Sequence, residues 1–437
     1  MLRTRARLVL VLPCLSTLAA SSAAQEKSAD KPQKSVEERL ADLEKKMSGD
    51  TMRVFWKDGL RFETSDKKYR FKLGGRIHYD GQFFDQDSET EAAVETSPTT
   101  RIEDGTEFRR VRLETSGEVA ERVDWALAVD FAGGSTNLRN AYAGIKDLPF
   151  GNVRAGQFKE PFSLESQTSS NNLLFTERSL AFAFVPHFNA GVMVFDTLAE
   201  ERMTWAVGGF RTASDAGEVS KDDGAWAGTA RITGLPYYAE DGKGYVHLGA
   251  GYSMRSPTDD GVTFSSKPEA NLAPSYVSSG ALAAEDVTLM GLEAAWTAGS
   301  LTVSGEYTMA SVDGDTGTTS DPDFSGYYVQ ASYLITGESR PYSKTAGAFG
   351  AVKPEENAFG EDNGIGAWEV ATRMSSIDLV DDGTDGGELD DLTFGVNWYL
   401  NPNSRLMLDY ILADLDPSGG GASGDTSIFA FRWQFNF

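Results

Sequence analysis

Residues 151–192 read GNVRAGQFKEPFSLESQTSSNNLLFTERSLAFAFVPHFNAGV. Residues 153–158 alternate as a strand does, and alternation returns at Gly191. The roughly 30 residues between them show no sustained strand pattern, and an irregular insertion of that length in a compact domain is usually functional. Its Phe and Leu side chains are interspersed with Ser, Thr and Asn. We therefore expect it to be partly buried and partly hydrated, as it would be in the lumen of a large β-barrel.

The chain around this insertion repeats with a period of two, which predicts strands with one apolar and one polar face. Val123, Trp125 and Leu127, for example, alternate with Asp124 and Ala126. We expect about sixteen strands, at residues 70–84, 107–118, 122–131, 139–147, 151–158, 190–197, 202–211, 224–234, 243–254, 284–297, 300–311, 325–336, 365–378, 391–401, 404–414 and 425–437. An even number is usual for single-chain bacterial barrels. The sequence thus predicts an all-β fold, a transmembrane antiparallel β-barrel with lipid on one face of each strand and water on the other.

The lengths of the connections predict two different ends of this barrel. Segments such as 119–121, 148–150 and 298–299 are short, whereas most of the alternate connections are longer. Short periplasmic turns and long external loops are the usual asymmetry of outer-membrane barrels. Segment 337–364 departs from the rule, since it should be periplasmic and yet is long.

A soluble β-sandwich or propeller is the alternative that composition alone leaves open. The last ten residues, IFAFRWQFNF, argue against it. One face of this expected strand carries Phe429, Phe431, Trp433, Phe435 and Phe437, and the other carries Arg432, Gln434 and Asn436. Five alternating aromatic side chains facing water would promote aggregation, so we expect them to face lipid.

The N-terminus has the pattern of a secretory signal peptide over residues 1–24. Three arginines precede the apolar run 8–20, and Ser22-Ala23-Ala24 is a small-residue cleavage site before Gln25. Cys14 lies too early in the apolar run for a lipoprotein signal, so it is expected to leave with the peptide. The mature chain then contains no cysteine and no disulfide.

The region between the signal and the barrel, residues 25–50, is expected to be a linker followed by a short helix. Val36, Leu40, Leu43 and Met47 are spaced as a heptad seam, and Ser35 with Glu38 makes a capping box. This helix is either a periplasmic coiled coil that helps subunits associate or an exposed amphipathic spacer. A small hairpin follows at residues 52–66, with its turn at Asp58-Gly59.

The chain is strongly acidic, with a formal charge of −25 that becomes about −28 once three signal-peptide arginines are removed. The acids are concentrated in expected loops such as 89–95 and 381–391. We interpret them as groups for solubility and for divalent-cation bridging to lipopolysaccharide at the cell surface. Net charge does not fix the sign of the field inside a cleft.

Several ordered motifs between about Arg70 and Phe437 resemble the phosphate-selective porins of the O/P family. They are GQFKEPFSLE, TSSNN and TERSLA in the insertion, FRRVRLETSGEV at Phe108, VDFAGG at Val129, LRNAYAGIKDLPFGN at Leu138, ITGESRPY at Ile335 and NWYLNPNSRLMLDY at Asn397. The resemblance implies a bacterial outer-membrane location, a homotrimer, and a loop at about 159–190 that folds into the barrel and narrows the pore. The terminal aromatic strand likewise resembles the signal read by the outer-membrane assembly machinery.

A channel needs no nucleophile, only groups that replace part of an ion's hydration without retaining it, and rings of Arg and Lys do so for phosphate. Arginines on the polar faces of strands are Arg110, Arg112, Arg231, Arg373, Arg405 and Arg432. By resemblance, the constriction comprises Arg76, Arg109, Arg110, Asp130 and Lys159, with Arg178 on the infolded loop. Arg112 is added to this set from its position on the polar face of a strand. Hydroxyl donors are expected from Ser163, Ser166, Thr168, Ser169 and Ser170. The alternative for each basic residue is a structural ion pair or a side chain that extends to water.

Two further expectations concern the geometry of these segments. Arg109 and Arg110 are adjacent, so both can face the lumen only at a bulge or at the rim of a strand. The aromatic run 182–188 resembles a sugar-binding track, but we expect it to pack the insertion against the barrel wall.

The sequence therefore predicts passive diffusion of anions, phosphate or polyphosphate by resemblance. A general porin for sugars or peptides and a barrel that tethers the envelope remain alternatives. An enzyme is not expected, because His78, His187 and His247 lie in no catalytic motif and no metal-ligand spacing is present. We expect no cofactor, no metal and no nucleic-acid partner.

Overall fold

The computed structural model describes residues 35–41, 52–212, 225–257, 261–314, 321–360 and 364–437, and the chain falls into two units, Met1–Asp50 and Thr51–Phe437. In the first unit, residues 36–41 form a helical turn. Ser35 and Glu38 cap it reciprocally, each side chain accepting the other's backbone N–H at 3.0 Å. The expected signal peptide, the linker and the remaining heptad positions lie outside the described residues.

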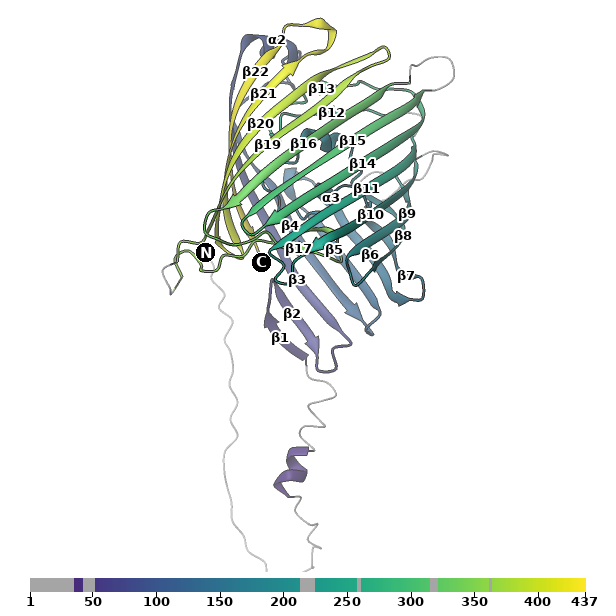
Figure 1. Ribbon diagram of the computed structural model, residues 1–437, viewed down its shortest axis with the longest axis vertical. Coiled ribbons are helices and arrows are strands. Elements are labelled where there is room, and N and C mark those ends of the chain that lie inside the picture. Colours follow the sequence, from purple (N-terminus) through teal and green to yellow (C-terminus); the bar gives the residue numbers. More distant parts are fainter. Residues whose placement is uncertain (1–34, 42–51, 213–224, 258–260, 315–320, 361–363) are drawn as a thin grey trace, which may run out of the picture. The chain divides into compact units, whose positions relative to one another are not determined.

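In the second unit, each strand pairs antiparallel with its neighbours along the chain until β22 pairs with β3 and closes a barrel (Figure 1). Among the described residues the sixteen barrel strands are β3 (Arg70–Gln86), β4 (Gly105–Val119), β5 (Val123–Asp130), β6 (Asn137–Leu148), β7 (Gly151–Lys159), β8 (Phe188–Leu198), β9 (Met203–Arg211), β10 (Trp226–Tyr238), β11 (Gly244–Ser256), β14 (Ala284–Ala298), β15 (Leu301–Gly314), β16 (Asp323–Leu334), β19 (Ala367–Asp381), β20 (Thr384–Asn401), β21 (Ser404–Asp416) and β22 (Gly424–Asn436). The predicted fold class is confirmed, and each expected strand overlaps one of these.

The hairpin expected at 52–66 is present as β1 (Met52–Trp56) and β2 (Leu60–Thr64). Gly59 in its turn has a φ of 121°, which favours glycine. β2 pairs with the first residues of β3, and β22 pairs with the rest of β3. The hairpin therefore extends the sheet beyond the end of the C-terminal strand.

The outer face of the barrel carries the apolar side chains that the alternation predicted. On β22, Phe429, Trp433 and Phe435 are exposed, whereas Arg432 and Gln434 are buried on the inner face. Other large exposed apolar residues on the barrel strands include Leu127, Tyr252, Trp296, Tyr307, Leu392, Phe394 and Leu408. Successive side chains point to opposite faces of a strand, so this pattern is the one a lipid-facing barrel wall requires. Among the described helices, none has the length and apolarity needed to cross a membrane.

One expected boundary is wrong: most of the acidic segment 381–391 is strand rather than loop, because β20 already begins at Thr384. The polarity of the strand is inverted here. Glu388 and Asp390 are exposed, whereas Leu389 between them is fully buried inside the barrel. In this part of the strand the apolar side chain faces inward and the acidic side chains face outward. The sequence is therefore mostly acidic and was interpreted as a loop.

The other acidic segment expected as loop, 89–95, is also mostly regular. Ser88–Val94 form helix α2, and the Asp87 side chain caps it by accepting the Thr90 N–H at 2.8 Å. The backbone N–H of Asp425 donates to the second oxygen of Asp87 at 2.9 Å. α2 is thereby fixed to the start of β22.

The two ends of the barrel differ as expected. Short turns join β4 to β5, β6 to β7 and β14 to β15, and the long segment 335–366 lies at this same short-turn end. That segment contains the small hairpin β17 (Tyr342–Ser343) and β18 (Ala348–Phe349). The long-loop end carries α2, η1 (Ala132–Gly134), β12 (Ser265–Ser266), β13 (Val277–Ser278) and η3 (Ser418–Gly420).

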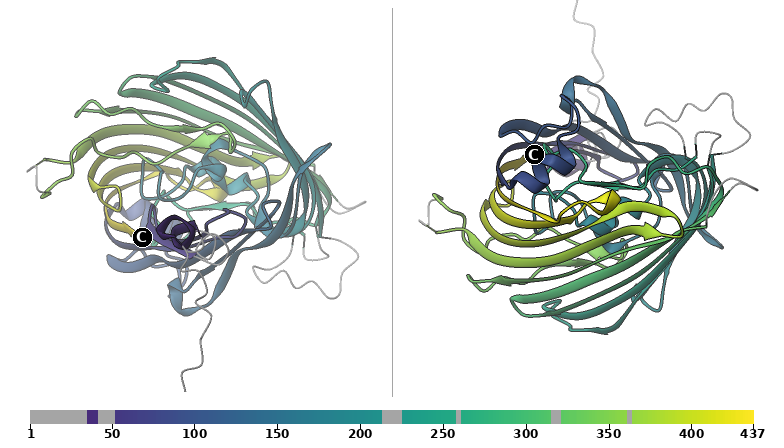
Figure 2. Two further views of the ribbon diagram at one scale, coloured as in Figure 1. Left: turned by 90° about the horizontal axis from the view of Figure 1, so that it is seen from below. Right: turned by 90° about the horizontal axis from the view of Figure 1, so that it is seen from above.

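Three connecting segments fold into the barrel interior, 160–187 and 261–283 from the long-loop end and part of 335–366 from the other (Figure 2). The first contains α3 (Leu164–Gln167) and η2 (Leu180–Phe184). A hydrophobic core forms where segments 160–187 and 261–283 meet the inner faces of β14–β16 and β19–β22. Its larger members are Phe162, Leu180, Phe184, Phe264, Leu289, Phe324, Ile377, Leu389, Ile411 and Ile428. This core explains the inverted polarity of β20 near Leu389. The inner face of the strand packs against apolar side chains there, whereas its outer face carries acidic residues.

Candidate functional site

The open space in the barrel lies on the side away from this core. A cavity of about 710 Å³ separates the infolded loop 160–187 from the inner wall of β3–β10. Nine of its lining residues are Arg or Lys and four are Asp or Glu. All seven residues expected at the constriction line it: Arg76, Arg109, Arg110, Arg112, Asp130, Lys159 and Arg178.

Both adjacent arginines reach the cavity because β4 is irregular where they lie. His78 pairs with Arg110 and the next residue of β3, Tyr79, pairs with Phe108, so Arg109 is an extra residue without a partner position. This is the bulge that the adjacent arginines predicted. Without it, one of the two guanidinium groups would point into lipid.

The infolded loop is held by side chains from the far wall of the barrel. The backbone N–H groups of Leu164 and Glu165 donate to the carboxylate of Glu306 at 2.9 and 2.7 Å. Thr176 N–H donates to Asp409 at 2.7 Å. Since buried backbone groups require partners, these carboxylates fix the loop's position.

Close packing adds to this anchoring. The Phe162 ring sits over Gly251, where a Cβ atom would come within 2.8 Å of the ring, and over Gly291, where it would come within 2.9 Å. Neither strand position therefore accepts a side chain without displacing the loop.

Six of the nine cations have a carboxylate partner. Arg76 binds Glu114 through two hydrogen bonds of 2.7 and 2.8 Å, Arg109 binds Glu177 through two of 2.7 and 3.0 Å, and Arg112 contacts Asp130 at 2.8 Å. The remaining pairs are Arg139–Asp130, Arg154–Asp124 and Arg231–Glu293. Pairing neutralises much of the charge that these groups present to the cavity.

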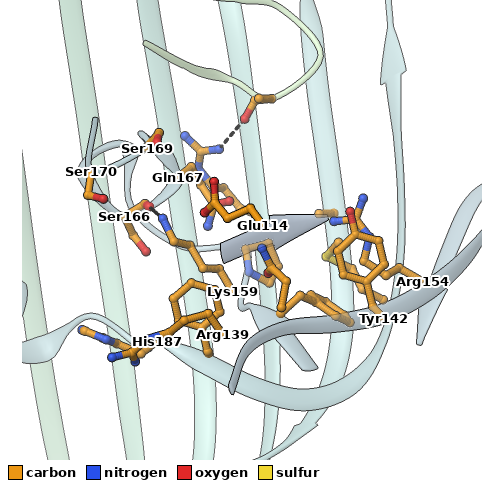
Figure 3. A pocket seen from close by; sticks show the side chains of 18 of the residues that line it. Glu114, Arg139, Tyr142, Arg154, Lys159, Ser166, Gln167, Ser169, Ser170 and His187 are labelled. Atoms are coloured by element: carbon orange, nitrogen blue, oxygen red, sulfur yellow. Dashed lines mark hydrogen bonds between the residues drawn. The ribbon is translucent and has the colours of Figure 1, made fainter. Parts of the chain in front are cut away.

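The other three, Arg110, Lys159 and Arg178, have no carboxylate within ion-pair distance among the residues that the structure describes. Lys159 donates to the carbonyl of Ser166 (Figure 3). Arg178 donates to the carbonyls of Glu165 and Thr168 at 3.3 and 3.4 Å. These cations are held by neutral groups, so their charge remains available to an ion in the cavity.

Arg110 is oriented by a histidine that no sequence pattern singled out. Its guanidinium lies 3.3 Å from Nδ1 of His78, and His78 Nε2 lies 3.0 Å from Oδ1 of Asn171. Arginine only donates, so Nδ1 accepts and Nε2–H donates. Neutral His78 thus links Arg110 to the infolded loop.

The remaining basic candidates are mostly structural. Arg373 and Arg432 are fully buried and bind Glu269 and Asp80. Arg405 donates to the Leu173 carbonyl and to Gln434 at 2.8 and 3.0 Å. Arg231 lines the cavity but is paired. For these four the ion-pair or hydrogen-bonded alternative describes the observed geometry.

Of the five expected hydroxyl donors, three line the cavity and two have structural contacts. Ser166, Ser169 and Ser170 line the cavity. Ser163 instead caps α3, and Thr168 accepts from Phe349 of the segment 335–366 at 3.3 Å.

A second cavity of about 600 Å³ continues toward the short-turn end, where Pro402 and Phe437 line it. It shares Arg76, Glu114, Asn140 and Ser169 with the first cavity. The Arg76–Glu114 pair therefore lies where the two spaces meet. The two cavities follow one wall of the barrel, and we call them together the passage.

Sequence reasoning missed several residues of this passage. Arg139 and Arg154 were not predicted to line the pore, although Arg154 lies on the polar face of an expected strand. Glu177 stands directly before Arg178 in the TERS motif, but it pairs with Arg109, which lies 68 residues away and which no local pattern indicates. Thr345 and Ala346 also line the first cavity, and nothing in their sequence indicates it.

Comparison with known proteins agrees with this architecture. A model of the family described as phosphate-selective porin O and P matches residues 71–437. Porin O of Pseudomonas aeruginosa is 28% identical over 422 residues, covering 87% of this chain and 91% of that protein.

Two solved porin structures share the fold. An anion-selective porin from Comamonas acidovorans has a TM-score of 0.56 at 12% identity and covers 84% of this chain and 100% of its own. Pseudomonas putida OprB has a TM-score of 0.51 at 10% identity, with 85% and 95% covered. At these identities the likeness concerns the fold alone, and the family match carries the assignment. The chain belongs to the phosphate-selective porin O and P family of the bacterial outer membrane.

Proposed function

We propose that this barrel is a passive channel for anions and that phosphate or polyphosphate is its preferred solute. The observation that carries the proposal is the group of three cations, Arg110, Lys159 and Arg178, which face one cavity without carboxylate partners among the described residues. The description of the family as phosphate-selective supports the choice of solute class.

An entering anion must compete with the groups that already bind these three cations. A guanidinium or ammonium group held by carbonyl oxygens or a neutral imidazole retains net charge, and an entering anion gains charge-assisted hydrogen bonds without displacing an internal carboxylate. The carboxylates of Glu114, Asp130 and Glu177 line the same cavity and limit how strongly any anion is held. Conduction requires this balance, because a solute must leave as well as enter.

The direct experiment is block of chloride current by inorganic phosphate in planar bilayers. We expect phosphate to reduce the current in the native channel. Lys159→Gln should weaken the block by roughly tenfold or more, since a hydrogen bond to a charged group contributes about 1.5–3 kcal/mol. Absence of block in the native channel would leave a general nutrient porin as the better description.

Three further features expected from the sequence are proposals of the same kind. They are removal of residues 1–24, a role of the 36–41 helical turn in association, and a homotrimer. Mass spectrometry of the mature chain and light scattering of the detergent complex, with and without residues 26–50, test them. Conductance retained without residues 26–50 would also weigh against an envelope tether.

A further inference from the structure

The cavity has an aromatic side that ion selectivity leaves unexplained. Phe182, His187 and Phe188, here called the aromatic shelf, all line it. The rings of Phe182 and His187 have centroids 4.7 Å apart, and His187 is exposed to the lumen. Phe184, by contrast, is buried against Phe264 in the hydrophobic core. Only part of the aromatic run therefore packs the loop against the wall.

The aromatic shelf lies next to two of the three cations that carry the proposed function. The Arg178 guanidinium carbon is 4.6 Å from the centre of the Phe182 ring. Lys159 Nζ is 5.7 Å from the centre of the Phe188 ring. Cations prefer such positions over aromatic faces. An anionic group bound by Lys159 and Arg178 would consequently place any substituent it carries against the aromatic shelf.

The combination recurs farther along the same barrel wall, because Arg154 lies on β7 with Lys159, and Phe195 lies on β8 with Phe188. The Arg154 guanidinium carbon lies 4.0 Å from the centre of the Tyr142 ring and 4.9 Å from that of Phe195 (Figure 3). Both rings line the same cavity. A planar group bound farther along these strands would therefore also meet aromatic and guanidinium surfaces.

These aromatic surfaces do not stabilise a small inorganic ion, because apolar rings cannot replace the hydrogen bonds of its hydration shell. The cavity's volume, about 710 Å³, falls in the range of sites that enclose organic ligands, which combine aromatic walls with a few polar groups.

We propose that the cavity binds organic phosphate esters with a planar apolar substituent, the phosphate on Lys159 and Arg178 and the substituent on the aromatic shelf. This inference rests on the proposed anion function and specifies its solute class. The aromatic shelf supplies the preference among anions, and the cations supply the requirement for charge.

The test compares phenyl phosphate, methyl phosphate and inorganic phosphate as blockers of chloride current through the full-length channel in planar bilayers. Phenyl phosphate should block at a concentration between about two- and tenfold below that of methyl phosphate, the range expected for a ring contact. Phenol at the same concentration should not block. Equal block by the two esters in an anion-selective channel would overturn the inference alone, and so would block by phenol equal to that by phenyl phosphate.

Variants assign the effect to the aromatic shelf. Phe188→Leu and Phe182→Leu should remove the advantage of phenyl phosphate over methyl phosphate. The ratio of the two esters is measured within each variant, so that any displacement of Lys159 or Arg178 affects both esters alike. Phe429→Leu on the lipid-facing surface is the matched control and should preserve the advantage. Lys159→Gln should weaken block by all three phosphates. An advantage that survives both shelf variants would contradict the inference, whereas a cation-selective native channel would remove the proposed function as well.

Discussion

Arg110 and His78 form a hydrogen bond of 3.3 Å across the β3–β4 pair, and His78 has no exposed surface. The bond orients a guanidinium group that has no carboxylate partner among the described residues. His78→Ala should leave Arg110 misplaced and weaken phosphate block severalfold, because removing one hydrogen-bond partner in a buried site costs about 1–3 kcal/mol. His247→Ala, at an equally buried histidine that lines neither cavity, is the control. Equal effects of the two substitutions would mean that His78 acts through stability alone.

Glu114 competes with permeating anions for Arg76 where the two cavities meet. Glu114→Gln should release Arg76 and lower the phosphate concentration needed for half-block by roughly tenfold or more, since a hydrogen bond to a charged group contributes about 1.5–3 kcal/mol. Glu118→Gln is the matched control, because Glu118 lies on the same strand, pairs with Arg70 and Lys146, and lines neither cavity. Unchanged block in Glu114→Gln would show that Arg76 does not contact the solute.

The hairpin of segment 335–366 narrows the passage from the short-turn end. Gly347 has a φ of 58°, and a Cβ there would lie 3.0 Å from Thr233 Oγ1 and 3.2 Å from Arg231 Nη1. Gly347→Val should push the hairpin out and raise single-channel conductance. Gly337→Val tests whether strain alone suffices, since Gly337 also has a positive φ, 104°, and a Cβ there would meet no described atom within 4 Å. A rise in both variants would remove the hairpin's specific role.

Asp87 gives the long-loop end a dependence on pH. The backbone N–H groups of Thr90 and Asp425 donate to its carboxylate and lower its pKa below the usual 3.8. A carboxyl group whose pKa is lowered by folding stabilises the folded state at pH values above its unfolded-state pKa. This contribution is lost as the pH falls through the folded-state pKa. We expect Asp87→Ala to cost about 1 kcal/mol of local stability at neutral pH and to speed proteolysis within 88–104. The difference from the native chain should vanish in acid, and a difference that persists there would contradict the carboxylate's role.

The fold was predictable because alternation is a local signal. Lipid selects apolar side chains on every second position, as in Phe429, Phe431 and Trp433, and each such strand shows the pattern by itself. The signal failed at Glu388–Asp391, where the partner of the inner face is a loop distant in sequence. Polarity there depends on tertiary packing, which no window of residues contains.

The sequence singled out residues that line one cavity, but it could not indicate which of those cations are paired with carboxylates. The resemblance to the family supplied six residues and strand alternation supplied Arg112, and all seven line one cavity. Whether a cation is paired depends on contacts such as Arg109 with Glu177, which lie 68 residues apart. The distinction between Arg373 and Lys159, one neutralised and one available, likewise follows from loop placement rather than from residue type.

The zero-current potential in a KCl gradient tests the central claim most directly, for the native channel and for the double variant Lys159→Gln/Arg178→Gln. We predict a potential of the sign that denotes chloride preference in the native channel, and a shift toward zero in the double variant. Lys243→Gln, in an exposed turn at the short-turn end, should leave the potential unchanged. A native potential of the opposite sign, or one that the double variant leaves unaltered, would contradict the account.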